Sequence, residues 1–528
     1  MTSTSNRRVF LAALIVGAGF LASKITGLLV DLLLAKNIGA GRNLDAYYAA
    51  FNLPDSVFML ISGGALAAAF MPIFSAYITR DDRPGAWKLA SAVINTAFLV
   101  AFVASMALAI LAPWIVSQTV GVGFQPDQQQ LTASLMRVIL IGTIIFAVSG
   151  IVMSALQANQ HFLLPALAPV LYNVGILLGV IVLAPRLGVW GPAIGVVIGA
   201  LLHLLIQVPG LIKYGARWTP WLGWRDPGLR RVIRLMLPRI AGLGVVQLAA
   251  LVTTSLASTL SAGSVTALNY GWRVMQLPET LIATAIATAA FPTLSEFAAR
   301  GQFDQLRATL SSTLRAILSL TLPATIVLLI LGRPFVQVMF ERGLFTSQAT
   351  DLVTWAVQGY ALGLIAQSLL EVCARTFYAQ QDTRTPLFVA VGAMVVGITA
   401  SVVLRNVLGV GGLALANSIG VTTEVIGLLI ILRKRLNGID ERRLVRSILK
   451  FAAGSIGLAV IAIGFQSFFS EFNLPASLAL NESLRAILKV GVPLIAAGGS
   501  GAIAYLLITV GLRSEEVRGL LKMIRRRA

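Results

Sequence analysis

Two ionisable residues, Lys24 and Asp31, lie inside a long apolar run from Val9 to about Ala35. On a helix this separation is two turns, so both side chains share a face, roughly 10 Å apart along the axis. A charge near the centre of a membrane helix costs about 2.5–3.5 kcal/mol, so it usually faces a cavity or an ionic partner. We expect this face to line a cavity, with Asp31 as the partner that sets the position and charge of Lys24. The alternative is a lysine that extends its ammonium group to the membrane surface.

A second polar pair, Asn52 and Arg273, occupies two other apolar runs, at the same separation that relates Leu187 to Leu408. Polar side chains at equivalent depth in two halves of a chain point to a shared cleft, where both would contact a substrate. The alternative for Arg273 is an anchor at the membrane surface, because aromatic residues precede it like an aromatic belt.

Pro54 and Pro278 interrupt the same two runs, and an acidic residue follows each of them, Asp55 or Glu279. A proline has no backbone N–H, so it frees a carbonyl group and permits a kink. We expect both prolines to bend cavity-lining helices and to act as hinges. Their separation slightly exceeds that of the polar pair, so their equivalence is approximate.

Enzyme and metal motifs give no comparable signal. The segment from Gly17 to Ala22 fits G-x-G-x-x-A, but it lies within a membrane helix, where close helix packing explains it. Cys373 is the only cysteine, and His161 and His203 are the only histidines, so neither a disulfide nor a His/Cys metal site is expected. We predict a protein that is not an enzyme, with no catalytic residue, no metal and no cofactor.

The composition places these residues in a membrane. The chain has 528 residues, of which 57% are hydrophobic and 12% charged, with a mean hydropathy of +0.85. A soluble domain carries about 25% charged residues. The net charge of +20 sits in short connectors between apolar runs, which indicates membrane topology rather than nucleic-acid binding.

Apolar runs long enough to cross about 30 Å of hydrocarbon occur along the whole chain. Lysine and arginine concentrate in the connectors on the side of the two termini, so the positive-inside rule places both termini in the cytoplasm. A window of roughly 19 residues predicts about 14 membrane helices, at 9–35, 46–78, 86–112, 131–156, 162–184, 188–212, 232–260, 265–298, 306–332, 350–378, 385–405, 411–432, 447–469 and 486–512.

An internal repeat organises these spans. Features of the first half recur at one constant separation in the second, as in Leu187-Gly188-Val189 and Leu408-Gly409-Val410. Each copy holds six predicted helices, an even number, so the copies enter the membrane in the same sense. We predict a first lobe at 1–220, a second at 221–440, and two additional helices with a basic cytoplasmic tail at 441–528.

Several segments resemble the MurJ/MviN family of lipid II flippases. The resemblance covers most of the chain, and an extra helix pair beyond twelve is that family's architecture, whereas related drug/cation antiporters generally have 12 helices. The segments are Gly39-Ala40-Gly41, Asp45 to Pro54, Gly63-Gly64-Ala65, Ala69 to Pro72, Leu235 to Pro238, Gly263-Ser264-Val265, Tyr270 with Arg273, Phe291-Pro292, and Tyr378 with Gln381-Asp382 and Thr385-Pro386.

The resemblance implies two six-helix lobes around a cationic cavity, open to one side of the membrane at a time. The cavity would bind the pyrophosphate and sugar-peptide head of lipid II, with Lys24, Arg273 and Asn52 as contacts and Asp45 at an outer gate. The polyprenyl tail would lie in a groove beside the two extra helices. A bulky anionic head needs positive charge in a low-dielectric chamber, whereas an apolar tail stays in lipid.

The chain departs from the family at several cavity positions. Lys24 and Val30 stand where the first helix usually has arginines, and Gly63 replaces a usual glutamate. The usual second-helix arginine falls near Phe58 or Met59. Lysine is a point charge without the bidentate fork of arginine, so it replaces arginine incompletely. Thr253 stands where some members have a sodium-binding acid, which argues against sodium coupling.

The leading hypothesis is therefore a flippase that moves a lipid-linked cell-wall precursor to the outer leaflet of the bacterial cytoplasmic membrane by alternating access. The alternatives are a multidrug or cation antiporter, a flippase for another lipid-linked oligosaccharide, and a scaffold paralogue that transports nothing. The expected partners are an undecaprenyl-pyrophosphate glycan, membrane lipids and other cell-wall synthesis proteins, with no nucleic acid.

Overall fold

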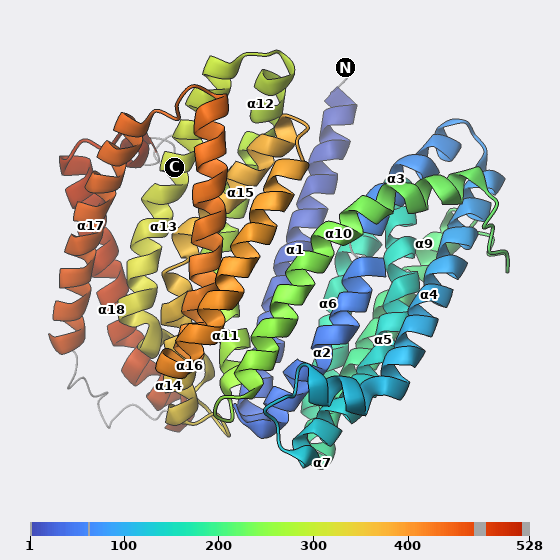
Figure 1. The fold of residues 1–528 in the computed structure, drawn as a ribbon, viewed down its shortest axis with the longest axis horizontal. Helices are drawn as coiled ribbons and strands as arrows, with labels where there is room; N and C mark the ends of the chain where they lie inside the picture. Colours follow the sequence, from blue (N-terminus) through green and yellow to red (C-terminus); the bar gives the residue numbers. More distant parts are fainter. Residues whose placement is uncertain (1–2, 62–63, 469–481, 520–528) are drawn as a thin grey trace. The chain divides into compact units, whose positions relative to one another are not determined.

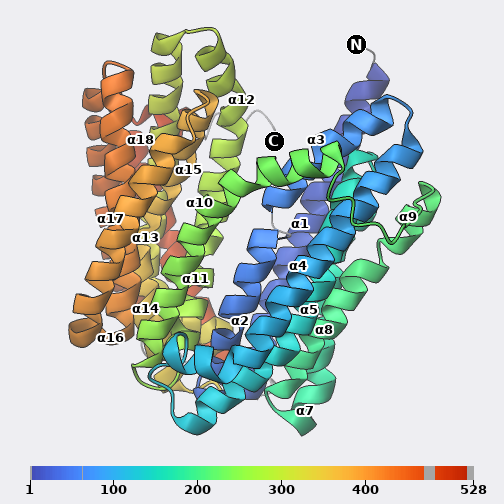
Figure 2. The same ribbon diagram turned by 45° about the vertical axis from the view of Figure 1, so that its right-hand side comes forward.

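The computed structural model describes residues 3–61, 64–468 and 482–519. Within these ranges the chain forms α-helices and two π-helical segments, with no strand (Figures 1 and 2). The predicted all-helical class is confirmed. The helices are α1 (Ser3–Ile38), α2 (Arg42–Ile61), α3 (Gly64–Thr79), α4 (Arg83–Gln118), α5 (Pro126–Ala158), α6 (Leu163–Leu178), η1 (Gly179–Leu183), α7 (Ala184–Leu187), α8 (Trp190–Leu205), α9 (Val208–Lys213), α10 (Pro227–Ser258), α11 (Ser264–Pro278), η2 (Glu279–Thr284), α12 (Ala285–Ala299), α13 (Phe303–Phe340), α14 (Ser347–Ala361), α15 (Leu364–Ala379), α16 (Arg384–Arg435), α17 (Glu441–Phe468) and α18 (Glu482–Gly511).

Large apolar side chains are exposed along many of these helices. Ile110 in α4 is 68% exposed, Leu281 in η2 is 73%, Val407 in α16 is 76% and Ile495 in α18 is 75%. Soluble proteins rarely expose extended apolar surface to water, whereas lipid tails solvate it. Ten described helices are long and apolar enough to cross a membrane. The chain is a multi-pass membrane protein.

The number of spans differs from the prediction. The count is ten, or up to twelve if α10, bent by 50°, and the α14–α15 pair, bent by 45°, each form one span. The predicted number of fourteen is not confirmed. Helix α16 counts once, although the non-helical angles of Gly409 (φ 55°, ψ −131°) divide it between two predicted spans. The span predicted at 46–78 is shared by α2 and the short helix α3.

Local backbone geometry recurs at the separation of the sequence repeat. Gly188 has φ 56° and ψ −132°, and Gly409, its counterpart in the second copy, has φ 55° and ψ −131°. Gln160 and Gln381, which are related in the same way, have φ values of 57° and 60°. Positive φ is uncommon for residues other than glycine, so its recurrence at matching turns supports the internal repeat.

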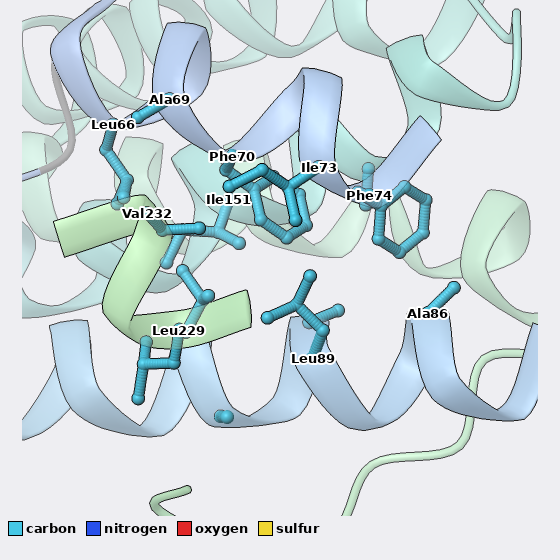
Figure 3. Close-up of a cluster of buried hydrophobic side chains, with 14 of the residues drawn as sticks. Leu66, Ala69, Phe70, Ile73, Phe74, Ala86, Leu89, Ile151, Leu229 and Val232 are labelled. Carbon is cyan, nitrogen blue, oxygen red and sulfur yellow. The ribbon is translucent and has the colours of Figure 1, made fainter. Parts of the chain in front are cut away.

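Contacts divide the chain into two compact units, Met1–Val265 with Gly343–Phe345, and Thr266–Arg342 with Thr346–Ala528. The first unit contains α1 to α10. Its core includes a cluster in which Phe70 and Phe74 of α3 pack near Leu89 of α4 and Leu229 of α10 (Figure 3). The first turns of α10 are therefore built into the first unit, although the sequence repeat predicts a lobe that ends at residue 220.

The second unit holds the additional helices α17 and α18 against α13. The Tyr505 hydroxyl of α18 donates to the Ser319 carbonyl of α13 at 2.5 Å. The guanidinium Nε of Arg315 in α13 lies 2.7 Å from Oε1 of Glu516, and both side chains are about nine-tenths buried. Burial acts to raise the pKa of Glu516, but hydrogen bonds from its backbone, Ser514, Arg315 and Ser447 outweigh burial and lower it. This ion pair fastens the end of the extra pair to α13.

Candidate functional site

Helix α1 approaches α6 closely on the side that carries Gly19. A Cβ atom at Gly19 would lie 2.6 Å from the Cβ of Ala166, so only glycine permits this approach. Asn173 of α6 donates from Nδ2 to the Ser23 carbonyl at 2.9 Å and to the Thr26 hydroxyl at 3.0 Å. The prediction of close helix packing in this glycine segment is confirmed at Gly19, and Asn173 is a polar contact that the sequence analysis missed.

Lys24 lies on α1 next to this packed face, and its side chain is exposed. Its Nζ atom lies 5.6 Å from the ring centroid of Phe20, within the range of a cation–π contact. Asp31, two turns further along α1, is only 3% exposed. The lysine is therefore accessible to a ligand while the carboxylate is enclosed. The proposed influence of Asp31 on Lys24 stays a prediction.

Asn52 joins α2 to α10 within the first unit. Its Nδ2 donates to the carbonyl groups of Tyr48 at 3.2 Å and Ala49 at 3.4 Å. Its Oδ1 accepts a hydrogen bond from the Thr254 hydroxyl of α10 at 3.1 Å. The Asn52 side chain therefore joins α2 to α10, and its contact with a substrate stays a prediction.

Asp45 is buried near the start of α2, with 2% of its surface exposed. Its Oδ2 accepts the backbone N–H of Gly263 at 2.6 Å, in the turn between α10 and α11. Gly263 has φ 91°, a conformation that favours glycine. The carboxylate thus ties this turn to α2, which is the type of contact that a gate would need. The gate itself stays a prediction.

The two prolines have different structural effects. Pro54 is buried inside the regular helix α2, and the nearby Ser56 hydroxyl donates to the Asn52 carbonyl at 2.7 Å. Pro278 ends α11 and is followed directly by the π-helical segment η2. A π-helical turn widens the backbone ladder and often marks a functional position. The irregularity at Pro278 is suited to a hinge, whereas the hinge at Pro54 stays a prediction from sequence.

Arg273 lies on the exposed side of α11. In the preceding turn the ring of Tyr270 stacks on Phe340 of α13, with centroids 4.7 Å apart, and Gly271 packs against Ala356 of α14. Aromatic and glycine packing fixes the rotation of α11 about its axis and leaves Arg273 accessible. Arg273 and Asn52 each lie roughly two and a half to three turns into their helices, as expected for equivalent positions.

A buried polar cluster in the first unit was not predicted. Ser149 of α5 lies with its Oγ 2.6 Å from Nδ1 of His203 in α8. Gln207 donates from Nε2 to the same hydroxyl at 2.9 Å and to the His203 carbonyl at 2.7 Å. His203 and Gln207 are one helical turn apart, which is the only sequence signal that could have indicated the cluster.

Metal ligands do not gather in the described part of the chain: no group of three or more His, Cys, Asp or Glu side chains is suitably placed there. The Thr253 hydroxyl donates to the Ala249 carbonyl of its own helix at 2.9 Å. Gly63 and the basic tail Arg525–Arg527 lie outside the described residues, so the expectations that concern them keep their standing as predictions.

The fold, with polar side chains inside apolar helices, is similar to the folds of solved membrane transporters. A solved structure described as lipid II flippase MurJ in an inward closed conformation matches with a TM-score of 0.78, covering 96% of this chain and 100% of that chain at 23% identity. An inward-facing multidrug resistance MATE transporter of the MOP superfamily matches with a TM-score of 0.68, covering 79% and 96% at 16% identity. These likenesses show that the chain has the MOP-superfamily fold.

Sequence comparison places the chain more narrowly. The family model described as "Lipid II flippase MurJ" matches residues 34–482, so the chain belongs to the MurJ family. The lipid II flippase MurJ of Burkholderia cenocepacia is 30% identical over 464 residues, covering 86% of this chain and 89% of the relative. A probable lipid II flippase MurJ of Vibrio cholerae is 31% identical over 429 residues, covering 79% and 81%. The family resemblance drawn from the sequence is confirmed.

Proposed function

We propose that this protein translocates lipid II from the inner to the outer leaflet of the bacterial cytoplasmic membrane. The observation that carries this proposal is the MurJ family match from residue 34 to residue 482. The relative from Burkholderia cenocepacia, described as a lipid II flippase, is covered over 89% of its length. Only a similarity of fold supports the antiporter alternative.

Transport would proceed by alternating access, with Lys24 and Arg273 as contacts for the pyrophosphate. Both side chains are exposed, so each is accessible to an anionic head group. Asn52 would hydrogen-bond the head group in exchange for Thr254, which it contacts in this structure. Asp31 would set the charge of Lys24, Asp45 would hold an outer gate, and Pro54 and Pro278 would accommodate helix bending.

The proposed lobes are residues 1–220 and 221–440, and the additional helices with the basic tail occupy 441–528. The polyprenyl tail would lie beside α17 and α18. The ion pair of Glu516 with Arg315 keeps these extra helices attached to α13. The chain would carry a lipid-linked substrate without chemical conversion, and other cell-wall synthesis proteins would receive the product.

Both termini are proposed to face the cytoplasm. Cys373 is fully buried and is the only cysteine, so single cysteines introduced at exposed sites give a clean signal. The Asp127 side chain is 73% exposed and the Asp304 side chain is 93% exposed. An impermeant maleimide should label Asp127→Cys in intact cells and Asp304→Cys only after permeabilisation. The reverse pattern would overturn the orientation.

The central experiment asks whether this gene rescues cells depleted of their own lipid II flippase. Rescue, together with lipid II arriving at the outer leaflet, is expected. Failure to rescue despite normal membrane abundance would refute the proposal. Rescue without measurable lipid II translocation would support the scaffold alternative.

A further inference from the structure

A basic pocket lies in the first unit, between the first turns of α4 and the coil that follows α9. Its volume is about 600 Å³, within the usual range of ligand sites. The coil runs beside the N-terminal end of α4 (Figure 2). The pocket is lined by Arg83, Pro84, Trp87, Lys88, Lys213, Tyr214, Gly215, Arg217 and Thr219, none of which belongs to the proposed transport site.

Side chains of α4 hold the backbone of the coil in place. Trp87 donates from Nε1 to the Tyr214 carbonyl at 3.2 Å. Ser91 accepts the N–H of Thr219 at 3.1 Å. Asn95 donates to the carbonyl groups of Thr219 at 2.8 Å and Trp221 at 3.0 Å. These contacts come from successive turns on one face of α4, so the backbone of the coil is held in one position along the wall of the pocket.

Four cationic side chains, from Arg83, Lys88, Lys213 and Arg217, line this pocket without an acidic residue among them. No ion pair joins any of the four to an acid in the described part of the chain. The nearby Asp82 carboxylate is occupied in capping α4 at Gly85. Gathering like charges is unfavourable unless an anion compensates them, so the pocket has the electrostatics of an anion site.

Further groups in the pocket suit a phosphate. The Thr219 hydroxyl oxygen is buried and has no hydrogen-bond partner among the described residues, which leaves a donor available. The Lys88 ammonium lies 4.5 Å from the ring centroid of Trp221, which positions this flexible charge at the pocket. Arginine, lysine and hydroxyl donors are the groups that bind phosphate oxygens in proteins.

The surroundings of the pocket indicate that the phosphate belongs to a lipid. Ile212 is 74% exposed, Trp218 is 67% and Trp224 is 60%. Tryptophan favours the membrane–water boundary, and an exposed isoleucine beside it fits the acyl region. A membrane boundary at these tryptophans would place the cations at the level of lipid phosphates, with apolar side chains beside the acyl chains.

We propose that this pocket binds the phosphate of an anionic membrane phospholipid. The lipid would fasten the coil after α9 to α4 and would anchor this end of the first unit at the head-group layer. The proposal depends on the chain being a membrane protein, and it stands independently of lipid II transport.

The test measures lipid binding to the full chain in neutral detergent by native mass spectrometry, with phosphatidylglycerol as the probe. Lys88→Gln, Lys213→Gln and Arg217→Gln are combined in one variant. Each basic residue near an anionic lipid contributes about fivefold in affinity, so the triple variant should bind up to roughly a hundredfold more weakly. A charge-retaining variant, with Lys88→Arg, Lys213→Arg and Arg217→Lys, should bind like the unmodified protein.

The matched control removes three exposed cations elsewhere, through Arg442→Gln, Arg443→Gln and Arg446→Gln at the start of α17. It changes the net charge equally and should lower phosphatidylglycerol affinity much less than the pocket variant, because these three side chains do not line the pocket. Equal losses in both triple variants, or no loss in either, would overturn the site. If glycerol 3-phosphate binds as tightly as phosphatidylglycerol, the lipid assignment is wrong. Because lipid II is absent from this assay, the result is separate from the outcome of the rescue experiment.

Discussion

Helix α2 and the segment formed by α11 and η2 occupy corresponding places in the two repeats, and they are built differently. In α2, Asn52 is hydrogen-bonded to Thr254, and Pro54 lies within a regular helix. In the second repeat Arg273 occupies the position of Asn52 and is exposed, and Pro278 leads into a π-helical turn. One copy is tied down by neutral hydrogen bonds, while the other carries a charge and an irregular backbone.

The turns at matching positions are alike, whereas the polar positions differ. Gly188 and Gly409 keep nearly identical backbone angles because glycine alone adopts them without strain. The polar positions have no such backbone constraint. At these two equivalent positions we therefore expect Arg273 to bind the anionic head group and Asn52 to provide a polar latch.

The largest expected effect comes from Arg273→Ala. Loss of the accessible cation of α11 should abolish rescue of flippase-depleted cells, and Arg273→Lys should rescue partly because it keeps the charge without the bidentate fork. Growth and protein abundance in the membrane are measured together. Arg300→Ala removes an exposed arginine paired with Glu296 and should leave growth unchanged. Normal growth of the Arg273→Ala strain would refute the assignment of the site.

Asp45→Ala tests the latch in the first copy. It leaves the Gly263 N–H without its buried acceptor, which should cost about 1–3 kcal/mol of stability. The expected result is a lower thermal unfolding midpoint of the purified chain in detergent. Asn43→Ala, an exposed side chain in the first turn of the same helix, should leave the midpoint unchanged. Equal midpoints for the two variants would contradict a structural contact at Asp45.

A double-mutant cycle on Asn52→Ala and Thr254→Val measures the α2–α10 contact. One neutral hydrogen bond predicts a coupling free energy of about 0.5–1.5 kcal/mol between the two changes. Thr253→Val serves as the control, since that hydroxyl bonds to its own helix. Additive effects of the Asn52 and Thr254 changes would mean that the two side chains are not coupled, and the latch between α2 and α10 would be refuted.

The connectors at equivalent positions 161 and 382 should respond to different pH ranges. Partial burial acts to raise the pKa of Asp382, but hydrogen bonds from Thr385 and Arg435 outweigh it and lower the pKa to about 2. The folded state therefore gains stability above the unfolded pKa and loses it as the pH falls from 3.8 towards about 2. Asp382→Asn should flatten unfolding midpoints in that range, and an unchanged pH profile would count against this hydrogen-bond network.

The smallest effect is expected at His161, the counterpart of Asp382. Burial, and then the charge of Lys213, lower the pKa of His161 below 6.5. Protonation is thus disfavoured in the folded state, so the full stability is present above pH 6.5 and declines as the pH falls below it. His161→Gln should remove this decline in the unfolding midpoint. A decline that persists unchanged in the variant would assign it to another group.

Sequence reasoning reached the class and the family because these depend on local patterns, and the same patterns predict the repeat. Apolar runs are set by the thickness of the membrane, and the glycines at 188 and 409 are set by the turns they occupy. The number of spans was harder to predict, because the number of helices differs from the number of apolar runs. The difference arises at the bends in α10 and between α14 and α15, and at the break at Gly409.

The composition and order of residues by themselves determined that this chain crosses a membrane repeatedly, and they predict that it is built from two copies. Only the tertiary structure decided which polar groups meet. Asp45 reaches Gly263, Asn52 reaches Thr254, and α4 holds a coil that lies far along the chain from it. Such pairs follow from how helices pack, and packing depends on the shapes of all neighbouring side chains rather than on any local pattern.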